Sequence, residues 1–155
     1  MQLSKNFWLS EFTKSQAATR RGLSNVPGPS EIAALRDLVE NVLQPIRDHF
    51  RVPVSISSGY RSAAVNRAVG GTGTSQHTKG QAADIEVSGV SNRDLAEWIR
   101  DNLPFDQVIL EGYNAAEGPN SGWVHVSYRK NSPRRSVLTA QFINGRAHYS
   151  RGINA

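Results

Sequence analysis

An apolar stripe with helical spacing runs from Ile32 to Phe50. Apolar side chains recur there at steps of three and four residues, which is typical of a helix with one face in a core. Ser30 stands just before the stripe and is a candidate N-cap. Pro45 lacks a backbone N–H, so it should kink or split this helix. The stripe therefore predicts a long helix that is interrupted near its C-terminal end.

Segments with the pattern of strands follow this helix. They are residues 52–57, 81–87, 105–111 and 123–128. Two last short strands are expected at residues 137–143 and 147–149, around the Asn144-Gly145 dipeptide, which is typical of a tight hairpin. Shorter helices are expected at residues 9–19, 61–69 and 92–102. Helices early and strands later predict an α+β fold with a small, mostly antiparallel sheet and helices packed on one side.

Length, charge and cysteine content narrow the class of protein. At 155 residues the chain has the size of one domain, and we expect a single domain over residues 1–155. The absence of cysteine excludes a disulfide framework, a thiolate metal site and a cysteine nucleophile. No apolar run approaches the roughly 18 residues of a membrane span. A net charge of +5 favours polyanionic partners, among them nucleic acid, anionic lipid and the bacterial envelope.

Two of the four histidines stand in surroundings suited to a metal site. His77 lies in a loop rich in small residues, and Asp84 follows in the next predicted strand. His125 lies on the last long predicted strand, where alternation places it on the polar face. Two imidazoles and a carboxylate are ordinary zinc ligands, and a catalytic zinc site usually has three protein ligands and a water. His49 and His148 are expected to have structural roles.

Several motifs together resemble a known family. Residues 75–84 read Ser-x-His-x-x-Gly-x-Ala-x-Asp, and residues 123–125 read Trp-Val-His. Residues 57–71 and the opening at 6–12 add similar stretches. The combination resembles the zinc D-alanyl-D-alanine peptidases of bacterial cell-wall metabolism over nearly the whole chain.

The resemblance implies a fold of the D,D-peptidase and hedgehog type, whose sheet carries a zinc site. His77, Asp84 and His125 match the zinc ligands of that family, so one Zn²⁺ ion is implied. Arg61 matches the arginine that holds the peptide substrate or its developing oxyanion. A guanidinium suits both tasks because it is always charged and offers a fork of donors. A surface arginine that caps a helix start remains the alternative for Arg61.

Three further residues are candidates for contacts with the substrate. Ser75 and Gln76 either line the substrate groove or hold the His77 loop by hydrogen bonds. Trp123 either forms a hydrophobic wall for the methyl groups of D-alanine or lies in the core. The sequence leaves these alternatives open.

The general base is expected to be a carboxylate near the last histidine of the motif. Several relatives place an acid three residues before that histidine, where this chain has Gly122. Glu111 is the best substitute, because an antiparallel pairing of its strand with the histidine strand would place it beside Trp123. Asp106 and Glu86 remain alternatives for the base.

The resemblance implies a zinc metallopeptidase that hydrolyses peptidoglycan peptides next to D-alanine. The bond is expected to be D-Ala-D-Ala, as in a carboxypeptidase, or the D-Ala–diaminopimelate cross-link, as in an endopeptidase. A small basic domain without a recognisable signal peptide resembles phage or prophage endolysins, which stay in the host cytoplasm until a holin releases them to the cell wall. The alternatives are a bacterial D,D-carboxypeptidase of cell-wall maturation, a phage virion component, and an inactive peptidase fold that binds the wall.

The expected partners are stem and cross-link peptides of peptidoglycan, and the protein is expected to be a monomer that does not insert into membranes. A basic cluster follows the last predicted site strand and comprises Arg129, Lys130, Arg134 and Arg135. Because no aromatic residues are interleaved with these charges, we expect a solvated basic edge and no binding of nucleic acid.

Overall fold

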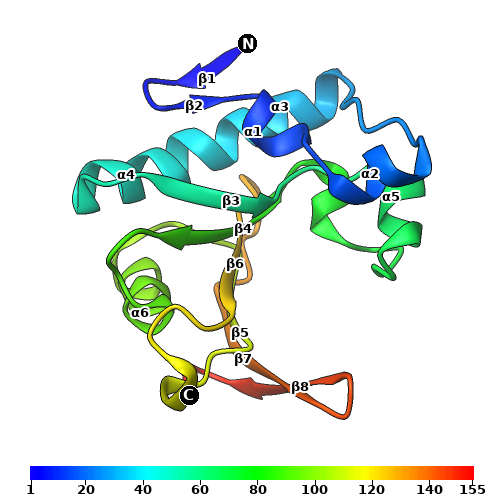
Figure 1. Ribbon diagram of the computed structural model, residues 1–155. Coiled ribbons are helices and arrows are strands. Elements are labelled where there is room, and N and C mark those ends of the chain that lie inside the picture. The colour runs from blue at the N-terminus through cyan, green and yellow to red at the C-terminus, as the bar shows by residue number, and fades with distance from the viewer.

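Six strands form one sheet in the order β3-β4-β6-β5-β7-β8 (Figure 1). The structure is a computed structural model that describes residues 1–155. The strands of the sheet are β3 (Val54–Ser58), β4 (Ala82–Val87), β5 (Gln107–Glu111), β6 (Trp123–Ser127), β7 (Ser136–Ile143) and β8 (Arg146–Arg151). All neighbours pair antiparallel except β5 and β7, which pair in parallel. A separate hairpin joins β1 (Gln2–Ser4) to β2 (Phe7–Trp8).

The long apolar stripe forms the predicted interrupted helix. Helix α3 (Pro29–Leu38) passes into a π-helical turn, η1 (Val39–Leu43), and then into α4 (Gln44–Phe50). The wider π turn ends at Leu43, two residues before Pro45, which cannot donate a backbone hydrogen bond. The interruption therefore falls where the proline predicts it.

Helix α3 begins earlier than predicted, and Ser30 is not its N-cap. Gly28 occupies the N-cap position and Pro29 the first helical position. The backbone N–H of Gly28 donates to Oε1 of Glu31 at 3.1 Å, so an acidic side chain closes this helix end. The fixed φ of proline suits the first helical position, which explains the shift.

Shorter helices complete the fold. They are α1 (Ser10–Thr13), α2 (Gln16–Arg21), α5 (Ala63–Ala68) and α6 (Asn92–Asn102), with the 3₁₀ turns η2 (Gln76–Lys79) and η3 (Ala115–Glu117). The single helix predicted over residues 9–19 is wrong. Lys14 is extended, and the Ser15 side chain caps a second helix by accepting a hydrogen bond from the N–H of Ala18. None of the helices has the length and apolar character needed to cross a membrane.

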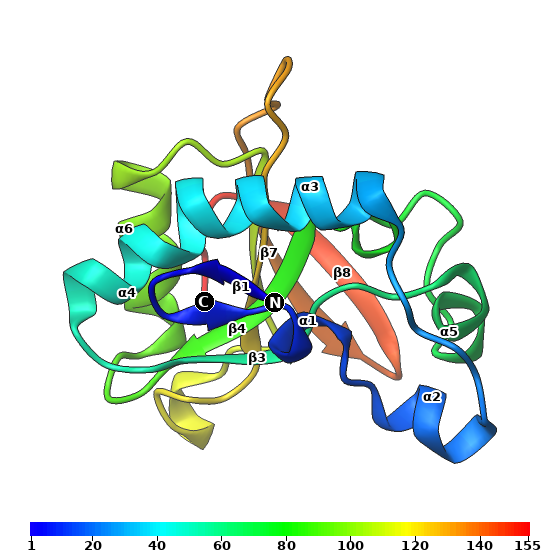
Figure 2. The ribbon, with the colours of Figure 1, turned by 90° about the horizontal axis from the view of Figure 1, so that it is seen from above.

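The hydrophobic core lies between one face of the sheet and the helices α3, α4 and α6 (Figures 1 and 2). On β4, β6 and β5, alternation buries Ile85, Val124 and Leu110 completely on this face. The neighbouring residues Asp84 and His125 point to the other face. The predicted α+β fold with a mostly antiparallel sheet is confirmed, and the second face of the sheet carries Asp84 and His125.

Candidate metal centre

Three elements bring His77, Asp84 and His125 together. His77 lies in the turn η2, Asp84 in β4 and His125 in β6. Asp84 and His125 are direct partners in the antiparallel register, so their side chains stand side by side on one face. One potential ligand atom from each residue lies within 4.8 Å of the other two. We refer to these residues as the His-Asp-His group.

The rings of both histidines face one carboxylate oxygen. Nδ1 of His125 lies 3.1 Å from Oδ1 of Asp84, and Nε2 of His77 lies 3.5 Å from the same oxygen. Burial raises the pKa of Asp84, but the hydrogen bond with His125 and the nearby His77 ring outweigh this effect and hold the pKa well below its usual range. Asp84 is therefore a carboxylate anion between two imidazoles.

The His77 ring is fixed from behind by a backbone carbonyl. Its Nδ1 lies 2.8 Å from the oxygen of Gly59, and because a carbonyl only accepts, Nδ1 carries the proton. Nε2 then presents its lone pair on the side of Asp84, and an outer contact of this kind commonly orients metal-ligating histidines. Two imidazole nitrogens and a carboxylate oxygen, held on separate elements, fit a zinc ion.

Replacing Gly59 by alanine should weaken metal binding indirectly. An added Cβ would lie 2.7 Å from Cα of Phe12, so the backbone at Gly59 or at Phe12 must shift, and a shift at Gly59 carries its carbonyl away from His77. Loss of an outer contact costs roughly 10–100-fold in metal affinity, and we expect a drop of that size in a zinc titration against a competing chelator. Gly73→Ala is the matched control, since no atom lies within 4 Å of its Cβ position. Equal zinc affinity in Gly59→Ala and the wild type would remove this role from the carbonyl.

Glu111 lies next to the His-Asp-His group, as the predicted strand pairing requires. Strands β5 and β6 pair antiparallel, with Glu111 opposite Trp123. Nε1 of Trp123 donates to Oε2 of Glu111 at 2.6 Å, which holds the carboxylate in place. Burial, and after it the charge of Asp84, raises the pKa of Glu111. Glu111 and the His-Asp-His group line one cavity of about 560 Å³, which we call the metal cavity.

Neither Glu86 nor position 122 supplies an acidic side chain to the metal cavity. Glu86 accepts a hydrogen bond from Nδ2 of Asn92 at 3.0 Å and does not line the metal cavity. Gly122 has a φ of +66°, and a Cβ there would overlap the carbonyl oxygen of Glu111. An acid at position 122 does not fit this backbone, so the carboxylate beside the His-Asp-His group is that of Glu111.

Asp106, the remaining candidate acid, anchors the turn that carries His77. It is completely buried, and Nη2 of Arg134 donates to its Oδ2 at 2.8 Å. Nε2 of Gln76 donates to the same oxygen at 3.0 Å, while Oε1 of Gln76 accepts from Arg134 at 3.0 Å. The Ser75 hydroxyl accepts a hydrogen bond from the N–H of His77 at 3.3 Å. Ser75 and Gln76 therefore hold the His77 loop, and both also line the metal cavity.

The buried Asp106 should make the stability of the fold depend on pH. Burial raises its pKa, but hydrogen bonds with Arg134 outweigh this and hold the pKa at about 2. A lowered folded-state pKa stabilises the fold above the unfolded-state pKa of about 4, and this stabilisation is lost as the pH falls below it. The advantage of the wild type over Asp106→Asn in urea unfolding should shrink by about 1 kcal/mol between about pH 5 and pH 2. The exposed Asp48→Asn is the control, and an advantage independent of pH would refute the assignment.

Arg61 enters the metal cavity from the segment between β3 and α5. Its backbone N–H donates to the carbonyl oxygen of His77 at 3.1 Å. Its buried Nε has no hydrogen-bond partner, and Nη1 reaches only Oδ1 of Asn66, at 3.5 Å. Burial lowers the pKa of Arg61, while the charges of Asp84 and Glu111 raise it. The structure therefore places a cation with unused hydrogen-bonding capacity beside the His-Asp-His group.

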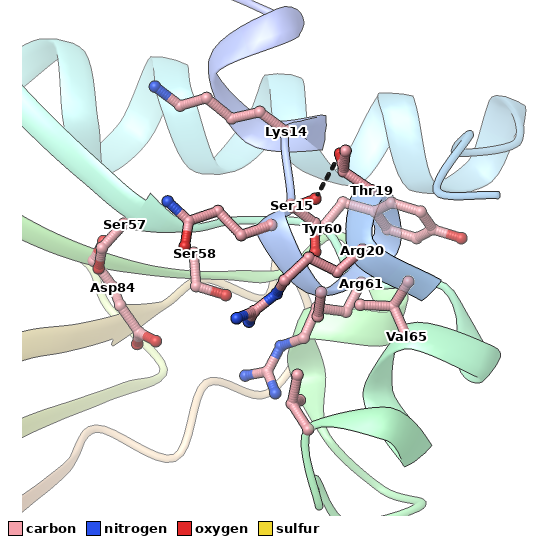
Figure 3. Close-up of a pocket in the computed structure, with 13 residues that line it drawn as sticks. Lys14, Ser15, Thr19, Arg20, Ser57, Ser58, Tyr60, Arg61, Val65 and Asp84 are labelled. Atoms are coloured by element: carbon pink, nitrogen blue, oxygen red, sulfur yellow. Dashed lines mark hydrogen bonds between the residues drawn. The ribbon is translucent and has the colours of Figure 1, made fainter. Parts of the chain in front are cut away.

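A second hollow of about 1040 Å³ continues from the metal cavity toward α2 (Figure 3). Arg61 and Asp84 line both hollows. Lys14 and Arg20 add two cations to the second one, and Figure 3 shows the guanidinium groups of Arg20 and Arg61 pointing into it. Lys14 and Arg20 were not among the residues that the sequence predicted for the site. No local pattern marks them, because they reach the site only through the packing of α2 beside α5.

Arg134 is another residue of the cavity that the sequence analysis missed. Arg134 is exposed, as expected for a solvated basic edge, but its side chain also lines the metal cavity and binds the buried Asp106. Its partner Gln76 is 58 residues away in the chain. Because the two residues are so far apart in the sequence, the local pattern around either one does not predict their contact.

A comparison with models of protein families identifies the family of this chain. The model described as Peptidase M15 matches residues 5–127, which is most of the chain. The chain belongs to the peptidase M15 family. M15 peptidases are zinc-dependent, so the resemblance seen in the His/Asp motif is confirmed, and the His-Asp-His group offers this M15 protein a place for the metal. Membership of the M15 family indicates a zinc metallopeptidase that acts on peptidoglycan. A search of curated proteins gives no match.

Proposed function

We propose that this M15 peptidase hydrolyses peptidoglycan peptides at a bond next to D-alanine. The observation that carries the proposal is a single cavity with the His-Asp-His group, the carboxylate of Glu111 and an arginine with unused donors. A metallopeptidase hydrolyses a peptide bond with a metal site, a group that carries protons and a cation that stabilises the anionic group. The adjoining hollow, with Lys14 and Arg20 on its wall, suits a peptide that carries free carboxylates.

Five residues of the metal cavity have defined roles in this proposal. His77, Asp84 and His125 hold one zinc ion, which when bound polarises a carbonyl oxygen and lowers the pKa of water. Glu111 takes a proton from the attacking water and passes it to the leaving amine, and its place in the metal cavity suits both transfers. Trp123 keeps the Glu111 carboxylate in place through its indole N–H.

Arg61→Ala should lower kcat/KM while the zinc content stays unchanged. A guanidinium that binds a substrate carboxylate or the developing oxyanion contributes on the order of 100-fold, and we expect a loss of that size in steady-state kinetics. Arg61→Lys keeps the charge but not the fork of donors, so it should recover only part of the rate. Arg67→Ala, on the exposed side of α5, is the matched control. Wild-type kinetics in Arg61→Ala would make Arg61 a structural residue.

The choice of bond is tested with defined peptides. The protein is incubated with a stem peptide that ends in D-Ala-D-Ala and with a dimer joined by a D-Ala–diaminopimelate cross-link. Release of the terminal D-alanine identifies a carboxypeptidase, and separation of the dimer identifies an endopeptidase. An otherwise identical peptide with L-alanine is the control, and its cleavage at the same rate would overturn the specificity for D-alanine.

We further propose that the enzyme is a phage or prophage endolysin that lyses the host cell. Its net charge of +5 favours contact with the anionic bacterial envelope. Genes for a holin or for tail proteins beside the coding sequence would support this role. A neighbourhood of envelope-biogenesis genes would instead favour a bacterial D,D-carboxypeptidase of cell-wall maturation.

A further inference from the structure

The hairpin of β7 and β8 extends the face of the sheet that carries the His-Asp-His group. The strand registers form one row across β6, β5, β7 and β8, made of Trp123, Glu111, Ala140 and Tyr149. Partners in neighbouring strands point to the same face, so Tyr149 shares the face of Glu111. Phe142 lies two residues beyond Ala140 on β7 and therefore points to this face as well.

Aromatic rings from this hairpin gather beside the metal cavity. Phe142 packs against Trp123, with the ring centroids 5.8 Å apart. Phe142 and Tyr149 both line the cavity, yet they leave 48% and 58% of their surface exposed. Partial burial, and after it the charge of Glu111, raises the pKa of Tyr149, which agrees with a position near that carboxylate. The cavity thus has an aromatic side that is open to a ligand.

The hydrophobic core does not account for these two rings. Phe142 and Tyr149 are outside the hydrophobic core of the protein. The match to the M15 family ends at residue 127, before β7 begins, so the hairpin lies beyond the matched region. Large apolar side chains that are exposed together at the rim of a cavity mark a binding surface.

We propose that Phe142 and Tyr149 form, together with Trp123, an aromatic wall that binds the hydrocarbon part of the substrate peptide beside the bond that is cut. This inference rests on the proposed function. The flat faces of the rings offer a large apolar contact area to methyl and methylene groups. On the side toward α2 the site is lined by the cations Arg61 and Arg20. A peptide is therefore bound in one direction, with its carboxylates at the arginines and its aliphatic side chains at the aromatic wall.

The test measures binding without turnover. Calorimetry on the zinc-loaded Glu111→Gln protein gives the Kd of a soluble muropeptide that carries a peptide stem. Phe142→Ala and Tyr149→Ala in this background should each weaken binding by about tenfold, because each removes a ring that covers the peptide. Tyr149→Phe keeps the ring and should bind within about twofold of the parent. Ile143→Ala is the matched control, since it removes a side chain that is 53% exposed on the same hairpin but outside the cavity.

Three results would overturn the aromatic wall. They are an unchanged Kd in both alanine variants, equal weakening by Ile143→Ala, and no binding by the Glu111→Gln parent. Thermal unfolding checks the fold of each variant, and Phe142→Leu, which lacks the flat ring, replaces Phe142→Ala if that variant unfolds and should weaken binding in the same direction. Failure of the proposed function has a separate readout, which is the absence of peptidoglycan cleavage by the wild-type protein.

Discussion

Zinc binding is expected to be lost when His77 or Asp84 is replaced by alanine. Each residue supplies one of three donor atoms that lie within 4.8 Å of one another, and two donors are too few for a catalytic zinc site. Removing an outer contact costs roughly 10–100-fold in metal affinity, so removing a ligand should cost more than about 100-fold. Metal analysis after gel filtration should give about one zinc ion per wild-type chain and almost none for either variant.

Controls separate loss of the ligand from loss of the fold. His77 is almost completely buried, so its truncation also removes packing around the loop, and circular dichroism must show that the variant is folded. Asp84→Asn keeps the shape of the side chain and removes its charge. His148→Ala removes an exposed histidine of β8 that is outside the His-Asp-His group, and it should keep its zinc. Full zinc occupancy in the His77 and Asp84 variants would disprove the ligand assignment.

Glu111→Gln is expected to keep its zinc and to lose most of its activity. Glutamine can still accept the hydrogen bond from the indole of Trp123, so the geometry of the cavity is preserved. It cannot take a proton from water, and a positioned general base contributes roughly 10²–10⁴-fold to the rate. We therefore expect kcat to fall by a factor in that range, measured on a soluble stem peptide alongside the zinc content.

The other two acids provide the comparison for Glu111. Glu86→Gln should leave kcat near the wild-type value, because Glu86 is hydrogen-bonded to Asn92 and lies outside the metal cavity. Asp106→Asn should lower stability through the loss of the contact with Arg134, with a smaller effect on kcat than Glu111→Gln. A wild-type rate in Glu111→Gln, together with a collapse in one of the other two variants, would move the role of the base to that residue.

The elements that sequence analysis predicted well depend on local patterns. Alternation along β6 placed Val124 and His125 on opposite faces, and the structure confirms this. The interruption of the long helix follows from the missing N–H of Pro45. The parallel pairing of β5 with β7 was not predictable in this way, because strand order depends on where the chain travels after β6.

The residues of the candidate site also divide into those that local patterns predict and those that long-range packing brings together. The His-Asp-His group was predictable because His77 and Asp84 share one short motif, because alternation places His125 on the polar face of its strand, and because the combined pattern resembles a known family. Arg134 and Phe142 could not be foreseen, since long-range packing of the C-terminal part of the chain brings them to the cavity. Their local surroundings look like an ordinary polar loop and an ordinary edge hairpin.

A digest of peptidoglycan by metal-analysed protein tests most directly whether this chain is a zinc peptidase of the cell wall. Purified Gram-negative sacculi are incubated with zinc-loaded protein, with and without chelator, and the products are identified by mass spectrometry. We expect cleavage next to D-alanine that stops on chelation and returns when zinc is added, seen as loss of cross-linked dimers or of terminal D-alanine. Intact peptidoglycan after incubation with zinc-loaded protein, or cleavage that the chelator does not affect, would contradict this account.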